Sequence, residues 1–155
     1  MIAKGLDSGA ICDYNGYIMA ANSRFAVAVH ALTLLALEAD ERRSSRDIAS
    51  SIATNPVVIR RLLAELSRAG LVESTHGAKG GFRLAKPAGA ISLLDIRSAV
   101  EDCGSLFGQR EKRNDKCPVA CRMGELLKDV FAKVEAKVAP ELKKTTLADI
   151  VRRVG

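Results

Sequence analysis

The sequence predicts a mainly α-helical protein that carries one small β-hairpin. Aromatic residues make up only 4% of the 155 residues and Trp is absent. A core of Ala, Val, Ile and Leu is therefore expected, which favours helices. Apolar residues recur at helical spacing along most of the chain. A glycine-rich turn at residues 77–81 separates two short runs with a strand-like pattern, which indicates a hairpin.

The N-terminal part is expected to contain a leader and one helix. Residues 1–21 are polar or small and have no periodicity, so we expect a disordered leader. The first helix should run from about residue 23 to residue 38, with Asn22 or Ser23 as its cap. One stripe of this helix is predicted to face the core: Phe25, Val29, Leu32 and Ala36.

Two short helices are expected next. The hydroxyl of Ser44 can cap the second helix while Asp47 reaches back to the cap. Asn55 is the expected cap of the third helix, and Pro56 suits its first position because an amide there has no helical partner. Gly70 is the expected left-handed stop. The predicted inward side chains are Ile48 and Ile52 on the second helix and Ile59, Leu62, Leu63 and Leu66 on the third.

The hairpin and the C-terminal helices follow in order. Strands are expected at about residues 71–75 and 82–85. Ser92 is the expected cap of a fourth helix that ends near residue 101. Residues 104–116 have the polar composition of a loop, and a long amphipathic helix comes after them.

The net positive charge of the chain lies in one segment. Residues 42–86 contain nine basic and three acidic residues, and this excess of six equals the formal net charge of the whole chain. Two short helices followed by a basic hairpin form the order of a winged helix-turn-helix. A basic surface of this kind is typical of nucleic-acid binding. The alternative is an ordinary solvated helix face.

The third helix and the hairpin supply the groups that duplex DNA requires. The expected exposed face of the third helix carries Asn55, Val57, Val58, Arg60 and Arg61. Arg can bind guanine through two hydrogen bonds, Asn can bind adenine, and Val can contact the methyl group of thymine. Glycines in the hairpin let the backbone approach phosphates. The residues predicted to contact DNA are Ser44, Ser45, Arg46, Asn55, Val57, Arg60, Arg61, His76, Lys79, Gly80, Gly81 and Arg83.

Several motifs resemble those of the Rrf2 family of bacterial regulators. They are residues 22–30 (NSRFAVAVH), 54–61 (TNPVVIRR), 69–72 (AGLV), 77–82 (GAKGGF), 91–96 (ISLLDI), 117–119 (CPV) and 146–150 (TLADI). The resemblance covers nearly everything after residue 21. It implies a dimeric winged-helix transcription factor, usually a repressor, that dimerises through its long C-terminal helix. Some members hold an iron–sulfur cluster, whereas others sense through thiols or a partner enzyme. The CPV segment and the adjoining helix resemble the branch that lacks the cluster.

The expected organisation has three parts. Residues 1–21 form the leader, 22–90 the winged helix-turn-helix with its N-terminal helix, and 91–155 a sensor loop and the dimerisation helices. Pro140 is expected to break or bend the long helix, and Thr146 to cap a last short one. A stripe of the long helix is too apolar for a lone exposed helix, which predicts a homodimer and a palindromic operator. This stripe is Leu127, Val130, Phe131, Val134 and Val138.

Three cysteines are candidates for sensing. Cys103 and Cys117 are separated by 13 residues, and Cys117 and Cys121 by three. Cluster-binding relatives space three cysteines closely and evenly, so we expect no cofactor here. An iron–sulfur cluster on these three residues is the alternative. Cys117 precedes Pro118 and should lie at a helix N-terminus, where the dipole favours a thiolate that Cys103 or Cys121 could resolve. The other alternative is that the cysteines only pack.

Other classes of protein fit the sequence less well. An enzyme is not expected, because the chain has two His residues and no nucleophile–base motif or phosphate-binding loop. A non-transcriptional binding module, such as an RNA binder, would need exposed stacking aromatics. The longest apolar run, residues 26–37, is too short to span a bilayer, and no signal peptide is evident. The sequence therefore predicts a cytoplasmic protein whose partners are double-stranded DNA and a second copy of itself.

Overall fold

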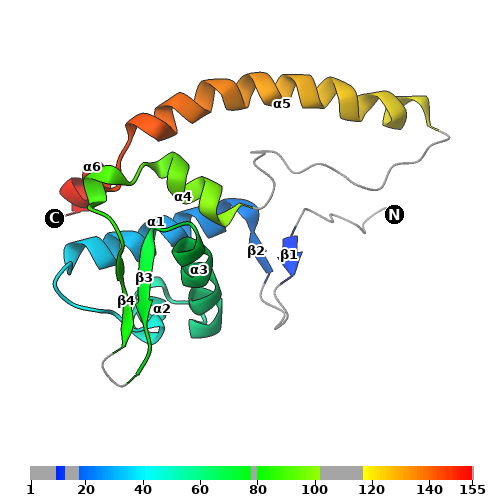
Figure 1. Ribbon diagram of the computed structural model, residues 1–155. Helices are drawn as coiled ribbons and strands as arrows, with labels where there is room; N and C mark the ends of the chain where they lie inside the picture. The colour runs from blue at the N-terminus through cyan, green and yellow to red at the C-terminus, as the bar shows by residue number, and fades with distance from the viewer. Residues whose placement is uncertain (1–9, 13–17, 78–79, 102–116, 155) are drawn as a thin grey trace.

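The computed structural model describes residues 10–12, 18–77, 80–101 and 117–154, and the side chains of residues 10–12, 18–23, 118, 120 and 121 lie outside the description. The described elements follow one another along the chain, with a short 3₁₀ helix, Ala88–Ala90, before α4 (Figure 1). They are β1 (Ala10–Cys12), β2 (Ile18–Ala20), α1 (Ala21–Leu37), α2 (Ser45–Ile52), α3 (Pro56–Arg68), β3 (Val72–Thr75), β4 (Gly81–Leu84), α4 (Leu93–Val100), α5 (Pro118–Lys144) and α6 (Leu147–Val154).

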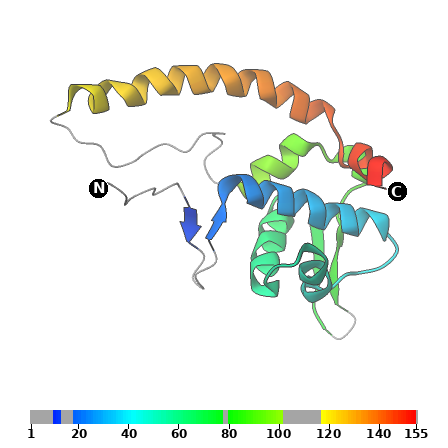
Figure 2. The ribbon, with the colours of Figure 1, turned by 180° about the vertical axis from the view of Figure 1, so that it is seen from behind.

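Helix α1 lies across the middle of the molecule. Figures 1 and 2 show α2, α3 and the β3–β4 hairpin on one side of it, and α4, α5 and α6 on the other. Of the predicted stripe only Leu32 is fully buried, whereas Phe25, Val29 and Ala36 are half-buried. All four belong to the core or pack against it, as predicted, but α1 has neighbours on both sides, so further residues of the helix are also buried. Its fully buried residues are Ala28, Ala31, Leu32 and Leu35, and the small alanines allow a close approach.

Helices α2 and α3 form as their capping residues predict. The hydroxyl of Ser44 accepts a hydrogen bond from the Asp47 amide, and the Asp47 carboxylate accepts one from the Ser44 amide. Oδ1 of Asn55 accepts from the amide of Val57 at 2.8 Å, with Pro56 in the first turn. The predicted inward residues of α3 are all buried, while Ile52 of α2 is half-buried.

The hairpin is attached to the rest of the domain by backbone hydrogen bonds. β3 and β4 pair antiparallel, with Val72 opposite Leu84 and Thr75 opposite Gly81. On the other edge of β4, Phe82 exchanges two backbone hydrogen bonds with Arg43. The connection between α1 and α2 therefore acts as a third strand at this point. The orientation of the hairpin relative to α2 follows from this pairing.

The C-terminal half joins the core through two local pairings. Leu93 donates its amide to Thr145 and Leu147 donates its amide to Ile91. These bonds hold the beginning of α4 against the end of α5 and the beginning of α6. As predicted, Ser92 caps α4 and Thr146 caps α6. No helix in the described part of the chain is long and apolar enough to cross a membrane.

Three predictions about the elements differ from the structure. Helix α1 begins at Ala21, so the expected caps, Asn22 and Ser23, lie inside its first turn. Helix α5 continues through Pro140 to Lys144 and does not break there. The proline lacks the amide that would donate a helical hydrogen bond, and its ring crowds the carbonyl four residues earlier, but the hydrogen bonds on either side continue the helix past it. Residues 10–12 and 18–20 pair as antiparallel strands where no regular structure was expected. The predicted loop at 104–116 lies outside the described residues.

Candidate nucleic-acid interface

The start of α2 is fixed by hydrogen bonds and an ion pair. Hydrogen bonds from Ser44 lower the pKa of Asp47, which keeps this carboxylate charged beside the positive end of the helix. Arg43 forms an ion pair with Glu38 at the end of α1, and the hydrogen bond in this pair raises the pKa of Arg43. These contacts hold the beginning of α2 in place. Arg46 remains exposed on its surface.

Two glycines make the turn of the hairpin possible. A Cβ atom on Gly80 would lie 2.2 Å from the carbonyl oxygen of Thr75, and one on Gly81 would lie 2.9 Å from that of Arg43. Neither separation is available to a real side chain, so both positions need glycine for contacts inside the protein. The sequence had suggested these glycines for the approach of phosphates, and the structure adds this internal reason.

A groove separates α3 from the hairpin. It has a volume of about 430 Å³ and brings together five residues that the sequence predicted for DNA binding: Ser44, Ser45, Arg60, His76 and Gly81. Ser45 is only 8% exposed, so it can offer little surface to a ligand. Arg60 and His76 are exposed at the two walls of the groove. A cation and an imidazole across a groove of this size suit the sugar–phosphate backbone of a nucleic acid.

Several residues of the groove were not predicted from the sequence. These are Ala64, Ser67, Ser74, Thr75 and Phe82. Helical spacing contained a signal for two of them, because residues 64 and 67 follow Arg60 by four and seven positions on one face. Their small side chains leave the space that a larger residue would fill. The strand residues become part of the groove only through the pairing of the hairpin.

Other predicted residues lie outside the groove. Val57 and Arg61 are exposed near the beginning of α3, where Asn55 is occupied in capping. Val58 was expected on the exposed face but is 8% exposed, because it turns toward the core between α2 and α3. Lys79 lies outside the described residues.

An acidic residue restrains two arginines in the hairpin. Glu73 of β3 accepts hydrogen bonds from Arg83 on β4, with Nη2 at 2.7 Å and Nε at 2.8 Å from the same carboxylate oxygen. Nη2 of Arg42 lies 3.9 Å from that oxygen. All three side chains are at least partly exposed. Arg83 therefore faces solvent with its charge already paired.

The candidate sensing residues are only partly within the described chain. Cys117 lies at the N-cap of α5, as predicted, and is half-buried without a capping hydrogen bond from its side chain. Cys103 and the side chain of Cys121 lie outside the description. In the part of the chain that is described, no three His, Cys, Asp or Glu side chains lie close enough together to hold a metal ion.

Known proteins resemble this chain over most of its length. Residues 21–153 match the Rrf2 family, described as an iron-dependent transcriptional regulator. The chain is 38% identical over 133 residues to YwnA of Bacillus subtilis, a proposed HTH-type transcriptional regulator, which covers 86% of this chain and 98% of YwnA. A proposed transcriptional regulator from Lactobacillus plantarum has 27% identity and a TM-score of 0.69, over 84% of this chain and 89% of the other. IscR of T. potens has 26% identity and a TM-score of 0.63, over 86% of each chain.

Proposed function

Because this chain belongs to the Rrf2 family of transcriptional regulators, we propose that α3 and the β3–β4 hairpin together recognise an operator in duplex DNA. The observation that carries this proposal is the groove between them, where Arg60 and His76 stand on opposite walls. The exposed start of α3, with Val57 and Arg61, would enter the major groove and contact bases. The hairpin would then contact phosphates beside it.

The test is binding of duplex DNA by a combined variant with Arg60→Ala, Arg61→Ala and Lys79→Ala. Operator DNA would first be selected by the wild-type protein from a pool of random duplexes. The variant should lose most of its affinity, and the slope of log affinity against log salt should be flatter because fewer phosphates are neutralised. Wild-type protein should bind duplex more tightly than single strands of the same sequence. Unchanged binding by the variant would refute the proposed interface.

The protein would act as a homodimer that represses by occupying a palindromic operator. The supporting observation is the surface of α5, where Leu127, Val130 and Val134 are exposed. An apolar helix face of this extent is unfavourable in water, and a second copy would cover it. Two-fold symmetry would then place the two α3 helices on half-sites about one or two turns of DNA apart. Such a protein must share a compartment with DNA, which in a bacterium is the cytoplasm. It needs no catalytic activity of its own.

We propose Cys117 as the residue that senses oxidation, with Cys103 or Cys121 as the resolving thiol. Its place at the N-cap of α5 supports this choice, because a helix N-terminus favours a thiolate. Peroxide treatment should lower the operator affinity of the wild type and leave Cys117→Ser unaffected. If the oxidised wild type binds as tightly as the reduced protein, the cysteines only pack.

A second candidate signal is iron, since the family is described as iron-dependent. An iron–sulfur cluster would need thiolates from Cys103, Cys117 and Cys121 and one further ligand. The cysteines are separated by 13 and then three residues, which departs from the close and even spacing of cluster-binding relatives, so we favour a protein without a cofactor. Visible absorption bands in protein purified without oxygen, lost in Cys117→Ser, would support the cluster instead.

A further inference from the structure

Helix α5 touches the other described elements over a short part of its length. Residues 122–130 are exposed on every side, and the half-buried residues of α5 begin at Phe131 and continue through Glu135 to Leu142. In Figures 1 and 2 the first half of α5 extends well away from the domain that contains α1 to α4. Among the described residues, the contacts that orient this long arm therefore lie toward its C-terminal end.

The first of these contacts is a pivot made of backbone. Thr145, just after α5, accepts the amide of Leu93, and the neighbouring bridge joins Ser92 to Thr146. These bonds fix the position of the end of α5 at the beginning of α4. A pair of hydrogen bonds at one point leaves the helix free to swing, so a second contact must set its angle.

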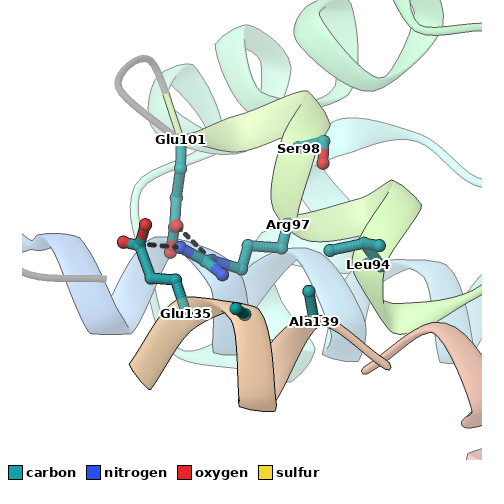
Figure 3. Close-up of a pocket in the computed structure, with 7 residues that line it drawn as sticks. Leu94, Arg97, Ser98, Glu101, Glu135 and Ala139 are labelled. Carbon is teal, nitrogen blue, oxygen red and sulfur yellow. Dashed lines mark hydrogen bonds and ion pairs between the residues drawn. The ribbon is translucent and has the colours of Figure 1, made fainter. Parts of the chain in front are cut away.

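The second contact is an ion pair between helices. Arg97 of α4 is buried, with 7% of its side chain exposed, and its Nη2 lies 4.0 Å from Oε1 of Glu135 on α5. On its own helix Arg97 also donates from Nε to Glu101 at 2.7 Å. Figure 3 shows the guanidinium of Arg97 pointing toward both carboxylates, that of Glu101 at the end of α4 and that of Glu135 on α5. The guanidinium is thus shared between a partner within α4 and a partner on the arm.

Packing beside this ion pair is incomplete. A cavity of about 300 Å³ lies between α4 and α5, lined by Leu94, Arg97, Ser98, Glu101, Glu135, Ala136 and Ala139. The small side chains of Ala136 and Ala139 leave this space open on the α5 side. Close packing normally fixes the angle between two helices. Here a pocket lies between the two helices, so packing at this point constrains the angle less.

Helix geometry amplifies any change at this contact. Glu135 is about 15 Å from the pivot at Thr145, and Pro118 is about 40 Å from it, at 1.5 Å per residue. Because Pro118 is nearly three times as far from the pivot as Glu135, a displacement of about 1 Å at Glu135 would move the beginning of α5 by about 3 Å. The exposed apolar residues Leu127, Val130 and Val134 lie on the part that moves.

We propose that Glu135, through Arg97, is a positioning residue that sets the angle of α5 and so the half-site spacing that the dimer accepts. This inference rests on the proposed dimer. Loss of the Glu135 charge leaves Arg97 paired with Glu101, so the buried arginine keeps a carboxylate. The fold should therefore survive in Glu135→Gln, while the arm becomes freer to swing.

The experiment compares wild type, Glu135→Gln and the control Glu141→Gln, which removes an exposed carboxylate from the same helix. Each binds the selected operator, versions with the spacer changed by one base pair, and a single half-site. Such a change shifts one half-site by about 3.4 Å and rotates it by about 35° around the DNA. Wild type and Glu141→Gln should lose at least about tenfold in affinity. Glu135→Gln should lose less than about threefold, with unchanged half-site affinity.

The outcomes separate this inference from the proposed function. A spacing dependence in Glu135→Gln equal to that of wild type would overturn the positioning role. A wild type that is itself insensitive to spacing would instead refute the proposed dimer. If Glu135→Gln also loses half-site affinity, Glu135→Asp tests the positioning role, since this variant keeps the carboxylate on a shorter side chain. That variant should shift the preferred spacing, and an unchanged preference would again overturn the inference.

Discussion

Arg60 of α3 belongs both to the exposed surface of the helix and to the groove beside the hairpin. Its side chain is exposed on the helix and also lines the groove that faces the hairpin. Arg61, the next residue, is exposed outside that groove. Because successive residues on a helix point about 100° apart, the two arginines address different parts of a bound duplex. Arg61 would face bases and Arg60 the backbone beside them.

Replacing each arginine should therefore have a different effect. Arg61→Ala should cost about 1–3 kcal/mol and relax specificity at one base position, whereas Arg60→Ala should weaken all sequences alike and flatten the salt dependence. Binding of a set of single-base operator variants at several salt concentrations measures both effects. Arg153→Ala, an exposed arginine on α6, is the control and should bind as wild type. Uniform weakening by Arg61→Ala would contradict the assignment of a base contact.

Glu73 should act in the opposite direction. It holds Arg83 through two short contacts and lies near Arg42, so its negative charge offsets the positive charge of the hairpin. We expect Glu73→Gln to bind duplex DNA more tightly and with a steeper salt dependence, because Arg83 is released to phosphates. The measurement is affinity for operator and for random duplex across a salt series. Weaker binding by Glu73→Gln would show instead that Glu73 orients Arg83 for DNA.

Among the elements, three helices begin with the same device. A Ser or Thr at the cap is followed three residues later by Asp, in Ser44–Asp47, Ser92–Asp95 and Thr146–Asp149. In each pair the aspartate accepts hydrogen bonds from the cap residue, and the pKa of the aspartate is lowered. Each carboxylate also lies at the positive end of its helix dipole. These helices therefore have their beginnings encoded locally.

The cap of α6 gives a prediction for pH dependence. Hydrogen bonds from the amide and then the hydroxyl of Thr146, and a contact with Arg152, lower the pKa of Asp149 from 3.8 to about 2. A carboxyl with a lowered pKa in the folded state adds stability above pH 3.8 and loses it as the pH falls toward about 2. Wild type should exceed Asp149→Asn in free energy of unfolding, and this difference should shrink over that range.

Urea unfolding at a series of pH values measures that difference. Asp129→Asn removes an exposed carboxylate from α5 and controls for the loss of one negative charge. If the difference between wild type and Asp149→Asn stays constant down to pH 2, the charged form of Asp149 does not contribute through the cap.

At the scale of the whole molecule, the main feature is the exposed apolar face of α5, which a second copy would cover. Val130 is 53% exposed and Leu127 is 39% exposed. The double variant Leu127→Asp/Val130→Asp should raise the dimer dissociation constant by about a hundredfold, because charges would be buried in an apolar interface. Sedimentation at micromolar concentration should then show a monomer that still binds a half-site. Val154→Asp, an exposed apolar position on α6, is the control, and a double variant that stays dimeric would place the interface elsewhere.

The sequence by itself determined the features that depend on neighbouring residues. Ser44, Asn55, Ser92 and Thr146 predicted where helices begin, since a cap acts within one turn. The glycine-rich turn predicted the hairpin for the same reason. The segment that contains the net charge, together with these elements, was enough to predict the fold class and the kind of partner.

Only the tertiary structure decided which distant residues meet. Arg24 pairs with Glu65, 41 positions later, and Glu73 accepts hydrogen bonds from Arg83 and forms an ion pair with Arg42. The burial of α1 on two sides, the walls of the groove, and the Arg97–Glu135 contact arise in the same way. Such contacts depend on the packing of whole elements, and helical periodicity describes one face of one helix at a time. The angle of α5, on which the spacing of the two halves of a dimer would depend, therefore follows from the folded molecule and not from any local motif.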